Sequence, residues 1–208
     1  MPKSKKRKIF LLVGISAFVF IFILLPILGH AWRRKNRVWH PPIAPVSGWK
    51  RFETDEGKFS VRFPGIPETT NILSSFSRTE DDLTIKVQTR AFYVNPNIQN
   101  AFAVGYSDSP IFFKMAKLPD PQEFLKKSES LAVLEAKGKV VFEQESKFQD
   151  FPAREFEYAT GGKANYSVRV KYILVGERVY EIYVVFLTTN PYPEERTVFF
   201  NSFKILTK

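Results

Sequence analysis

The chain contains no cysteine, and its only two histidines, His30 and His40, lie near the N-terminus. The absence of cysteine excludes disulfides, thiolate metal sites and a cysteine nucleophile. Because no histidine follows residue 40, the rest of the chain also lacks a Ser-His-Asp triad and a histidine-based zinc site. Enzymatic chemistry there would have to rest on carboxylate, lysine, tyrosine or serine side chains.

Motifs that bind phosphate or carry a nucleophile are missing as well. There is no G-x-x-x-x-G-K-[ST] loop, no G-x-G-x-x-G turn and no G-x-S-x-G elbow. Gly161, Gly162 and Lys163 place a glycine pair before a lysine, but no helical pattern follows, so we interpret them as a hairpin turn. We therefore expect a protein that is not an enzyme and holds no cofactor or metal, with a carboxylate-based enzyme as the remaining catalytic alternative.

Acidic residues are absent from the first 40 positions, which contain nine of the 31 lysines and arginines. The remaining positions carry 22 basic and 21 acidic side chains and are nearly neutral. The net charge of +10 is thus a property of the N-terminal segment. Basic and aromatic residues do not interleave as a stacking platform, so we expect no nucleic-acid binding.

An uninterrupted apolar run extends from Ile9 to Leu28, between two basic clusters. At about 1.5 Å per residue, a helix of this length matches a hydrocarbon core of roughly 30 Å. We predict a basic tail over residues 1–8, a transmembrane helix over 9–31 and a basic, proline-rich linker over 32–47. The run from Ile9 to Leu28 would contact membrane lipid.

The orientation of this single pass is only weakly specified, because basic residues stand on both sides of it. An arrangement with the rest of the chain on the extracytoplasmic side is mildly favoured. Gly29, His30 and Ala31 offer small residues for signal-peptide cleavage, so a secreted or periplasmic protein is the alternative.

Residues 48–208 are long enough for one hydrophobic core and show mostly strand patterns. Phe59, Val61 and Phe63 alternate with polar residues, as in a half-buried strand. We expect strands over residues 58–63, 70–78, 83–94, 101–108, 139–148, 153–158, 167–175 and 179–187, and a short one over 203–206. We interpret residues 180–187 as apolar on both faces, which predicts helices on both sides of the sheet.

Two helices are predicted in this domain. Asp120 suits the N-cap of the first and Pro121 its first turn, while Gly138 stands where the segment ends. Its buried face is predicted to carry Phe124, Leu131 and Leu134, with Glu129 in water. The second helix spans about 193–201. The pattern predicts an α+β fold, an α/β/α sandwich with a central, mainly antiparallel sheet, preceded by one N-terminal transmembrane helix.

Phe112 and Phe113 are candidate partner-binding residues. They follow Pro110 in a segment without strand periodicity, and exposed aromatic side chains mark interfaces. Packing of both rings across the sheet is the alternative.

Two acidic segments are further candidates for a functional site. Glu80, Asp81 and Asp82 cluster at the expected hairpin tip, but they lack the alternating spacing of a calcium loop, so a solvated tip is favoured over a metal site. Asp108 lies in a Tyr-Ser-Asp-Ser-Pro turn and is a weaker candidate for a functional carboxylate.

Several short motifs, in this order, resemble a known family. They are Trp49, Gly57 to Gly65 (GKFSVRFPG) with Pro67, Phe151 to Phe156 (FPAREF), Gly176 to Tyr180 (GERVY), and Asn201 to Phe203 (NSF). Together they are similar to bacterial membrane-anchored proteins of uncharacterised function with a PsbP/Mog1-like domain, over roughly residues 48–206. The resemblance implies an α/β/α sandwich and an accessory role, and it brings no catalytic residues.

The function expected from these observations is that of a noncatalytic, membrane-anchored domain that binds a protein partner or assists a membrane-associated complex. A small-molecule or lipid carrier with an apolar pocket between sheet and helices is the alternative.

Overall fold

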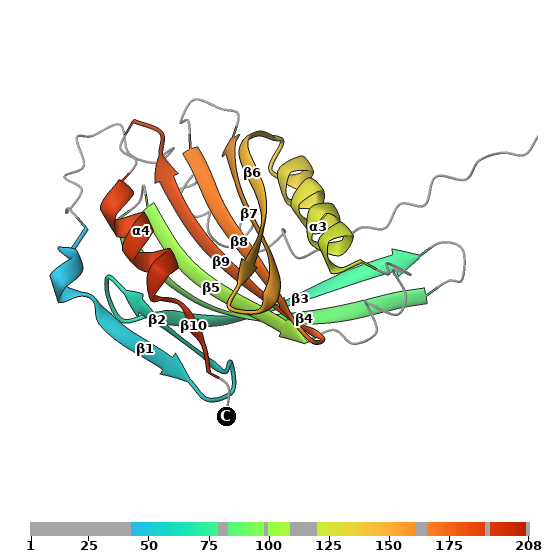
Figure 1. Ribbon diagram of the computed structural model, residues 1–208, viewed down its shortest axis with the longest axis horizontal. Helices are drawn as coiled ribbons and strands as arrows, with labels where there is room; N and C mark the ends of the chain where they lie inside the picture. Colours follow the sequence, from blue (N-terminus) through green and yellow to red (C-terminus); the bar gives the residue numbers. More distant parts are fainter. Residues whose placement is uncertain are drawn as a thin grey trace, which may run out of the picture.

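The computed structural model describes residues 43–78, 83–97, 100–108, 120–160, 166–189 and 192–206. Within these ranges the chain forms two antiparallel sheets and two α-helices (Figure 1). The predicted α+β class with mainly antiparallel strands is therefore confirmed.

The large sheet has seven strands in the order β3-β4-β5-β9-β8-β7-β6. Their bounds are β3 Glu68–Arg78, β4 Leu83–Asn97, β5 Asn100–Asp108, β6 Gly138–Phe148, β7 Phe151–Thr160, β8 Tyr166–Val175 and β9 Arg178–Leu187. The predicted strands in these regions are all present. Gly176 takes a φ of 60° in the turn from β8 to β9, a left-handed conformation that glycine adopts without strain.

A second, three-stranded sheet was not predicted. It consists of β1 Lys50–Thr54, β2 Phe59–Phe63 and β10 Lys204–Ile205, with β2 in the centre. A short 3-10 turn, η3 Val46–Gly48, precedes it. The expectation that β2 is half-buried is wrong, because its side chains are buried on both faces apart from Arg62. Phe59, Val61 and Phe63 pack in a hydrophobic cluster with the large sheet, and Ser60 is buried on the other face.

The helix α3, Pro121–Glu135, begins as the sequence predicts, with the Asp120 carboxylate accepting a hydrogen bond from the Gln122 amide at 3.0 Å. It packs on β6, β7 and β8. The predicted helix face is partly wrong, because Leu134 is 69% exposed and Glu129 is buried. The inward stripe instead follows Phe124, Leu125, Ser128, Glu129 and Ala132.

The second helix, α4 Pro193–Ser202, lies on the opposite face of the large sheet and contacts β2. Helices thus cover both faces, as predicted, but α4 shares its face with the small sheet (Figure 1). Two hydrophobic clusters result. One lies between α3 and the sheet, the other between the sheet and the layer formed by α4, β1, β2 and β10.

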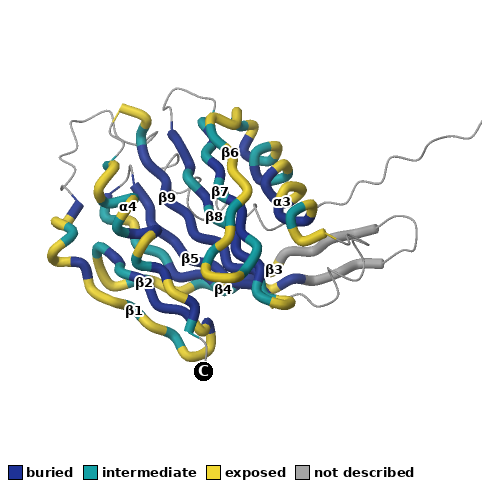
Figure 2. Tube along the Cα trace, in the orientation of Figure 1, coloured by how far each residue is buried: buried dark blue, intermediate teal, exposed yellow. Residues whose placement is uncertain are grey.

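Burial follows this layering. The central strands β5, β8 and β9 are largely buried, whereas β1 and the edge strand β6 are mostly exposed (Figure 2). On the sheet face that α4 covers, the central strands are therefore shielded from solvent. Side chains closer to β6 on this face reach solvent.

Candidate functional site

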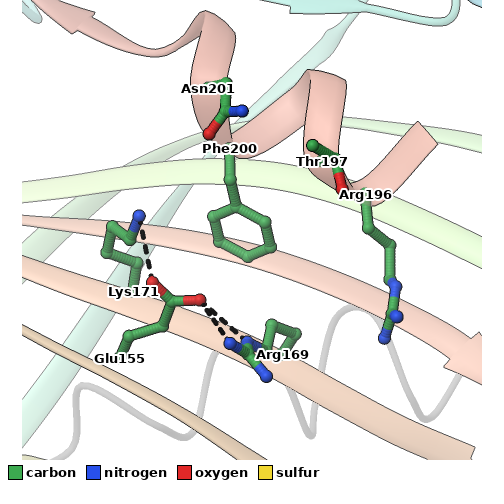
Figure 3. A pocket seen from close by; sticks show the side chains of 7 residues that line it. All are labelled: Glu155, Arg169, Lys171, Arg196, Thr197, Phe200 and Asn201. Carbon is green, nitrogen blue, oxygen red and sulfur yellow. Dashed lines mark hydrogen bonds and ion pairs between the residues drawn. The ribbon is translucent and has the colours of Figure 1, made fainter. Parts of the chain in front are cut away.

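A pocket of about 240 Å³ lies between α4 and the strands β7 and β8 (Figure 3). The residues that line it are Glu155 from β7, Arg169 and Lys171 from β8, and Arg196, Thr197, Phe200 and Asn201 from α4. Side chains of a strand alternate between the two faces of a sheet, so the strand residues between these, such as Phe156 and Val170, join the core on the α3 side. The charged strand residues of the pocket, Glu155, Arg169 and Lys171, therefore lie on the sheet face that α4 covers.

Five charged side chains form a continuous series of ion pairs at this pocket, in the order Lys171, Glu155, Arg169, Glu157 and Arg196. Glu155 lies 3.1 Å from Lys171 Nζ and 2.6 Å from Arg169 Nη2. Glu157 lies 3.3 Å from Arg169 Nη1 and 3.6 Å from Arg196 Nη1. Three cations therefore face two carboxylates, and the site has an excess of one positive charge.

Strand register brings four of these residues together. Glu155 is directly opposite Lys171, and Glu157 is directly opposite Arg169 in the β7–β8 pair. Opposite charges at directly facing positions stabilise an antiparallel pair. Arg196 joins from α4, so the fifth charge depends on how the helix docks on the sheet.

Aromatic rings flank all three cations. The guanidinium carbon of Arg169 lies 4.0 Å from the ring centroid of Phe142, and that of Arg196 lies 4.3 Å from the centroid of Phe186. Lys171 Nζ lies 5.4 Å from the ring of Phe200. A cation over the face of a ring is attracted to it, so these contacts help to hold the charged groups in place.

Arg196 is the least satisfied of the three cations. Its Nε atom is buried and has no hydrogen-bond partner among the described residues, and its contact with Glu157 is long. Burial lowers the pKa of Arg196, and Glu157 only partly offsets the effect while Arg169 adds to it. A further anion at this pocket would supply the missing compensation.

The carboxylate of Glu155 stays ionised. Its partial burial raises the pKa, but the charges and hydrogen bonds of Lys171 and Arg169 outweigh burial, so the pKa of Glu155 lies below its usual value. An acid with a lowered pKa is a poor proton donor near neutral pH. The arrangement is thus suited to electrostatic binding and ill suited to acid catalysis.

Sequence reasoning did not find this site. Charged residues that alternate with apolar ones, as in Glu155 and Glu157, are also the ordinary pattern of a half-exposed strand. The opposing alternation of Arg169 and Lys171 was visible, but only the register shows that the two pairs face each other. Arg196 comes from an element 25 residues further along the chain than Lys171.

Most of the candidate site residues taken from the sequence fall in segments that the structure does not describe. Phe112 and Phe113 lie outside the described residues, as do the acidic cluster at 80–82 and the Gly-Gly-Lys segment at 161–163. The pairing of β3 with β4 confirms the hairpin that ends at the acidic cluster. The exposure of Phe112 and Phe113 stays a prediction.

Asp108 forms an ion pair with Arg178. It ends β5 directly opposite Arg178 of β9, and both of its oxygens accept hydrogen bonds from Arg178, each at 2.6 Å. Arg178 also donates to the Glu56 carbonyl oxygen at 2.9 Å. The pair therefore joins an end of the large sheet to the β1–β2 turn.

The structure buries a carboxyl group where the sequence pattern indicates apolar side chains. Glu181 of β9 is fully buried, although residues 180–187 are expected to be apolar on both faces. Tyr183 Oη donates a hydrogen bond to Glu181 Oε2 and lies 3.2 Å from Tyr172 Oη. Burial raises the pKa of Glu181 to about 8, against the opposing effect of the Tyr183 hydrogen bond.

The described residues contain neither a metal-binding cluster nor a membrane-spanning helix. No group of three or more histidine, cysteine, aspartate or glutamate side chains there is arranged to hold a metal ion. None of the helices in the described part of the chain is long and apolar enough to span a bilayer. The predicted transmembrane helix over residues 9–31 lies outside the described ranges.

Comparison with known proteins finds similarity in structure alone. No protein-family model and no curated protein sequence matches the chain. The solution structure of cyanobacterial PsbP (CyanoP) from Synechocystis sp. PCC 6803 matches with a TM-score of 0.51 and 8% identity, over 82% of this chain and 99% of that one. A Pseudomonas aeruginosa protein of unknown function matches with a TM-score of 0.38 and 11% identity, over 72% and 90%. The first of these matches shows that the chain has a PsbP-like fold.

Proposed function

We propose that this chain is a noncatalytic accessory protein that binds a protein partner at a membrane, to which residues 9–28 anchor it. The observation that carries partner binding is the pocket beside α4, where Arg196 is partly buried without full compensation of its charge. A PsbP-like fold is compatible with this role, and fold similarity alone does not assign it. Anchoring rests on the length and the basic flanks of the apolar run.

The chemistry of the described residues supports a noncatalytic role. Glu155 and Glu157 each contact two cations, and the lowered pKa of Glu155 makes this residue a poor proton donor near neutral pH. Glu181 is fully buried and thus closed to a substrate. The domain also has no histidine or cysteine to act as base or nucleophile.

A carrier of small molecules or lipids is the alternative function, and the pocket does not favour it. Its lining is mostly charged or polar, with Phe200 as the one aromatic wall. Ligand pockets for apolar molecules are lined mainly by hydrophobic side chains and are larger, roughly 300 to 1,000 Å³.

The native mass of the full-length protein tests the proposed function. The chain would be extracted from its own membrane in mild detergent after gentle crosslinking, and the mass of the complex measured. We expect a discrete assembly, far heavier than the 24.1 kDa chain with its detergent, that contains another polypeptide. A bare monomer contradicts stable partner binding, and a monomer with a bound small molecule favours the carrier.

A further inference from the structure

We propose that the pocket beside α4 binds an acidic side chain, glutamate or aspartate, of the partner polypeptide, with Arg196 as the residue that recognises the carboxylate. This inference rests on the proposed function and specifies the chemistry of the contact. The excess positive charge, the accessible volume and the apolar wall of the pocket each support it.

The charge balance selects an anion. In the series of ion pairs, each carboxylate contacts two cations, and Arg169 contacts both carboxylates. Arg196 ends the series with a single ion pair, at 3.6 Å to Glu157. A guanidinium has five N–H donors in a planar fork that matches a carboxylate, so Arg196 retains donors for a ligand.

The pocket has room for one side chain. About 240 Å³ of space is open between α4 and the sheet, enough for a carboxylate with its methylene groups. Phe200 forms a wall of this space, and Figure 3 shows its ring between Lys171 and Arg196. An aromatic wall beside cations suits an acid carried on an apolar stem better than a free inorganic ion.

The surroundings suit a polypeptide. Phe142 and Phe148 of the edge strand β6 are half-buried and lie against Arg169 and Lys171. These rings extend the surface from the pocket towards the edge of the sheet, since β6 is the last strand of the order. We therefore expect the acidic residue of the partner to have apolar neighbours that contact these rings.

Peptide binding to the full-length chain in detergent tests this inference. The probe is a short fluorescent peptide with two glutamates between leucines, and matched peptides carry glutamine or lysine in place of the glutamates. Fluorescence anisotropy should show binding of the glutamate peptide that weakens as salt is raised, because exposed charge pairs are screened. Equal affinity for the glutamate and glutamine peptides would overturn the inference.

Arg196→Gln is the diagnostic variant. It should weaken binding of the glutamate peptide by at least about tenfold, because removal of one partner of a charged contact costs at least that much affinity. Arg196→Lys should retain part of the affinity, since it keeps the charge and loses the planar fork. Arg51→Gln is the matched control, because Arg51 lies on β1 with a 60% exposed side chain, outside the pocket. Equal weakening by Arg51→Gln, or none by Arg196→Gln in a variant whose circular dichroism is unchanged, contradicts the inference.

Competition with inorganic phosphate separates a partner side chain from a free anion. We expect phosphate to displace the peptide no better than chloride of the same ionic strength. Displacement at low phosphate concentration would show a site for a small anion and would overturn the polypeptide assignment.

The two proposals fail in different ways. If the heavy assembly forms equally with Arg196→Gln, the pocket is not the contact, although partner binding stands. If the wild-type chain is a bare monomer but binds the glutamate peptide through Arg196, the pocket assignment stands and the stable complex does not.

Discussion

The carboxyl group of Glu181 is buried on the α3 face of the large sheet, opposite Gly105 of β5. Its Oε1 atom has no hydrogen-bond partner among the described residues. A buried acid with one hydrogen bond is more stable neutral than ionised, which is why its pKa rises to about 8.

The stability of the protein should therefore depend on pH through Glu181. Below about pH 4.5 the group is protonated in both the folded and the unfolded chain, so it adds no pH dependence. As pH rises from about 4.5 to about 8, the unfolded chain ionises first, and the free energy of unfolding falls by up to about 1.4 kcal/mol per pH unit. Above about pH 8 both states are ionised and this contribution levels off.

Glu181→Gln should remove this dependence, because the amide does not titrate. Urea unfolding at several pH values should show the variant gaining stability over the wild type from pH 5 to pH 8, with a shallower pH slope. Glu53→Gln is the control, since Glu53 is a surface residue paired with Arg51. Parallel stability curves for Glu181→Gln and the wild type would contradict the raised pKa.

The helix α3 is attached to the large sheet by a buried ion pair as well as by apolar packing. Arg154 of β7 contacts the carboxylates of Glu129 on α3 and Glu143 on β6. The Arg154 and Glu129 side chains are both only 4% exposed. This pair explains why Glu129 lies in the inward stripe of the helix, where periodicity alone placed it in water.

Arg154→Met should destabilise the protein by about 3 to 5 kcal/mol, because it leaves the Glu129 carboxylate buried without its cation. Glu143→Gln should cost less than about 1 kcal/mol, since its side chain is 52% exposed. Chemical unfolding measures the free energy of unfolding of both variants and of the double variant Glu129→Met with Arg154→Met. We expect the double variant to recover much of the loss, and no recovery would show that packing, not the unpaired charge, causes it.

The small sheet is held to the large one by aromatic packing and by a hydrogen bond to the turn between β1 and β2. Phe59 is completely buried, and its ring contacts those of Phe52, Phe92, Tyr106, Tyr180 and Phe203. Tyr180 Oη also donates to the Gly57 carbonyl oxygen at 2.9 Å. A Cβ at Gly57 would lie 2.7 Å from the Phe59 ring, so glycine is needed for this close approach.

The two sheets should unfold as one unit, because the hydrophobic clusters lie on opposite faces of the same strands. Phe59→Ala should lower the free energy of unfolding by about 3 to 5 kcal/mol. Far-ultraviolet circular dichroism and the fluorescence of the tryptophans, which include the buried Trp49, should give the same shifted urea midpoint. Separate midpoints would show that the small sheet unfolds independently.

Most of the strands and both helices can be predicted from the sequence, since these elements follow from local patterns. The alternation at Phe59, Val61 and Phe63, the Asp120 cap with Pro121, and the turn at Gly176 each correspond to an element in the structure. The mainly antiparallel α+β class followed from the same signals, because short connections join antiparallel neighbours.

Contacts between residues that are far apart in the sequence follow only from the tertiary structure. The second sheet forms because β10, at the other end of the domain, pairs with β2. The burial of Glu129 and Glu181 depends on Arg154 and on the strand opposite, and the pocket depends on α4 bringing Arg196 to the paired charges of β7 and β8. The periodicity of a sequence indicates on which side of a strand or helix a residue lies. Which residue it contacts on that side depends on strand register and packing, and both are properties of the folded chain.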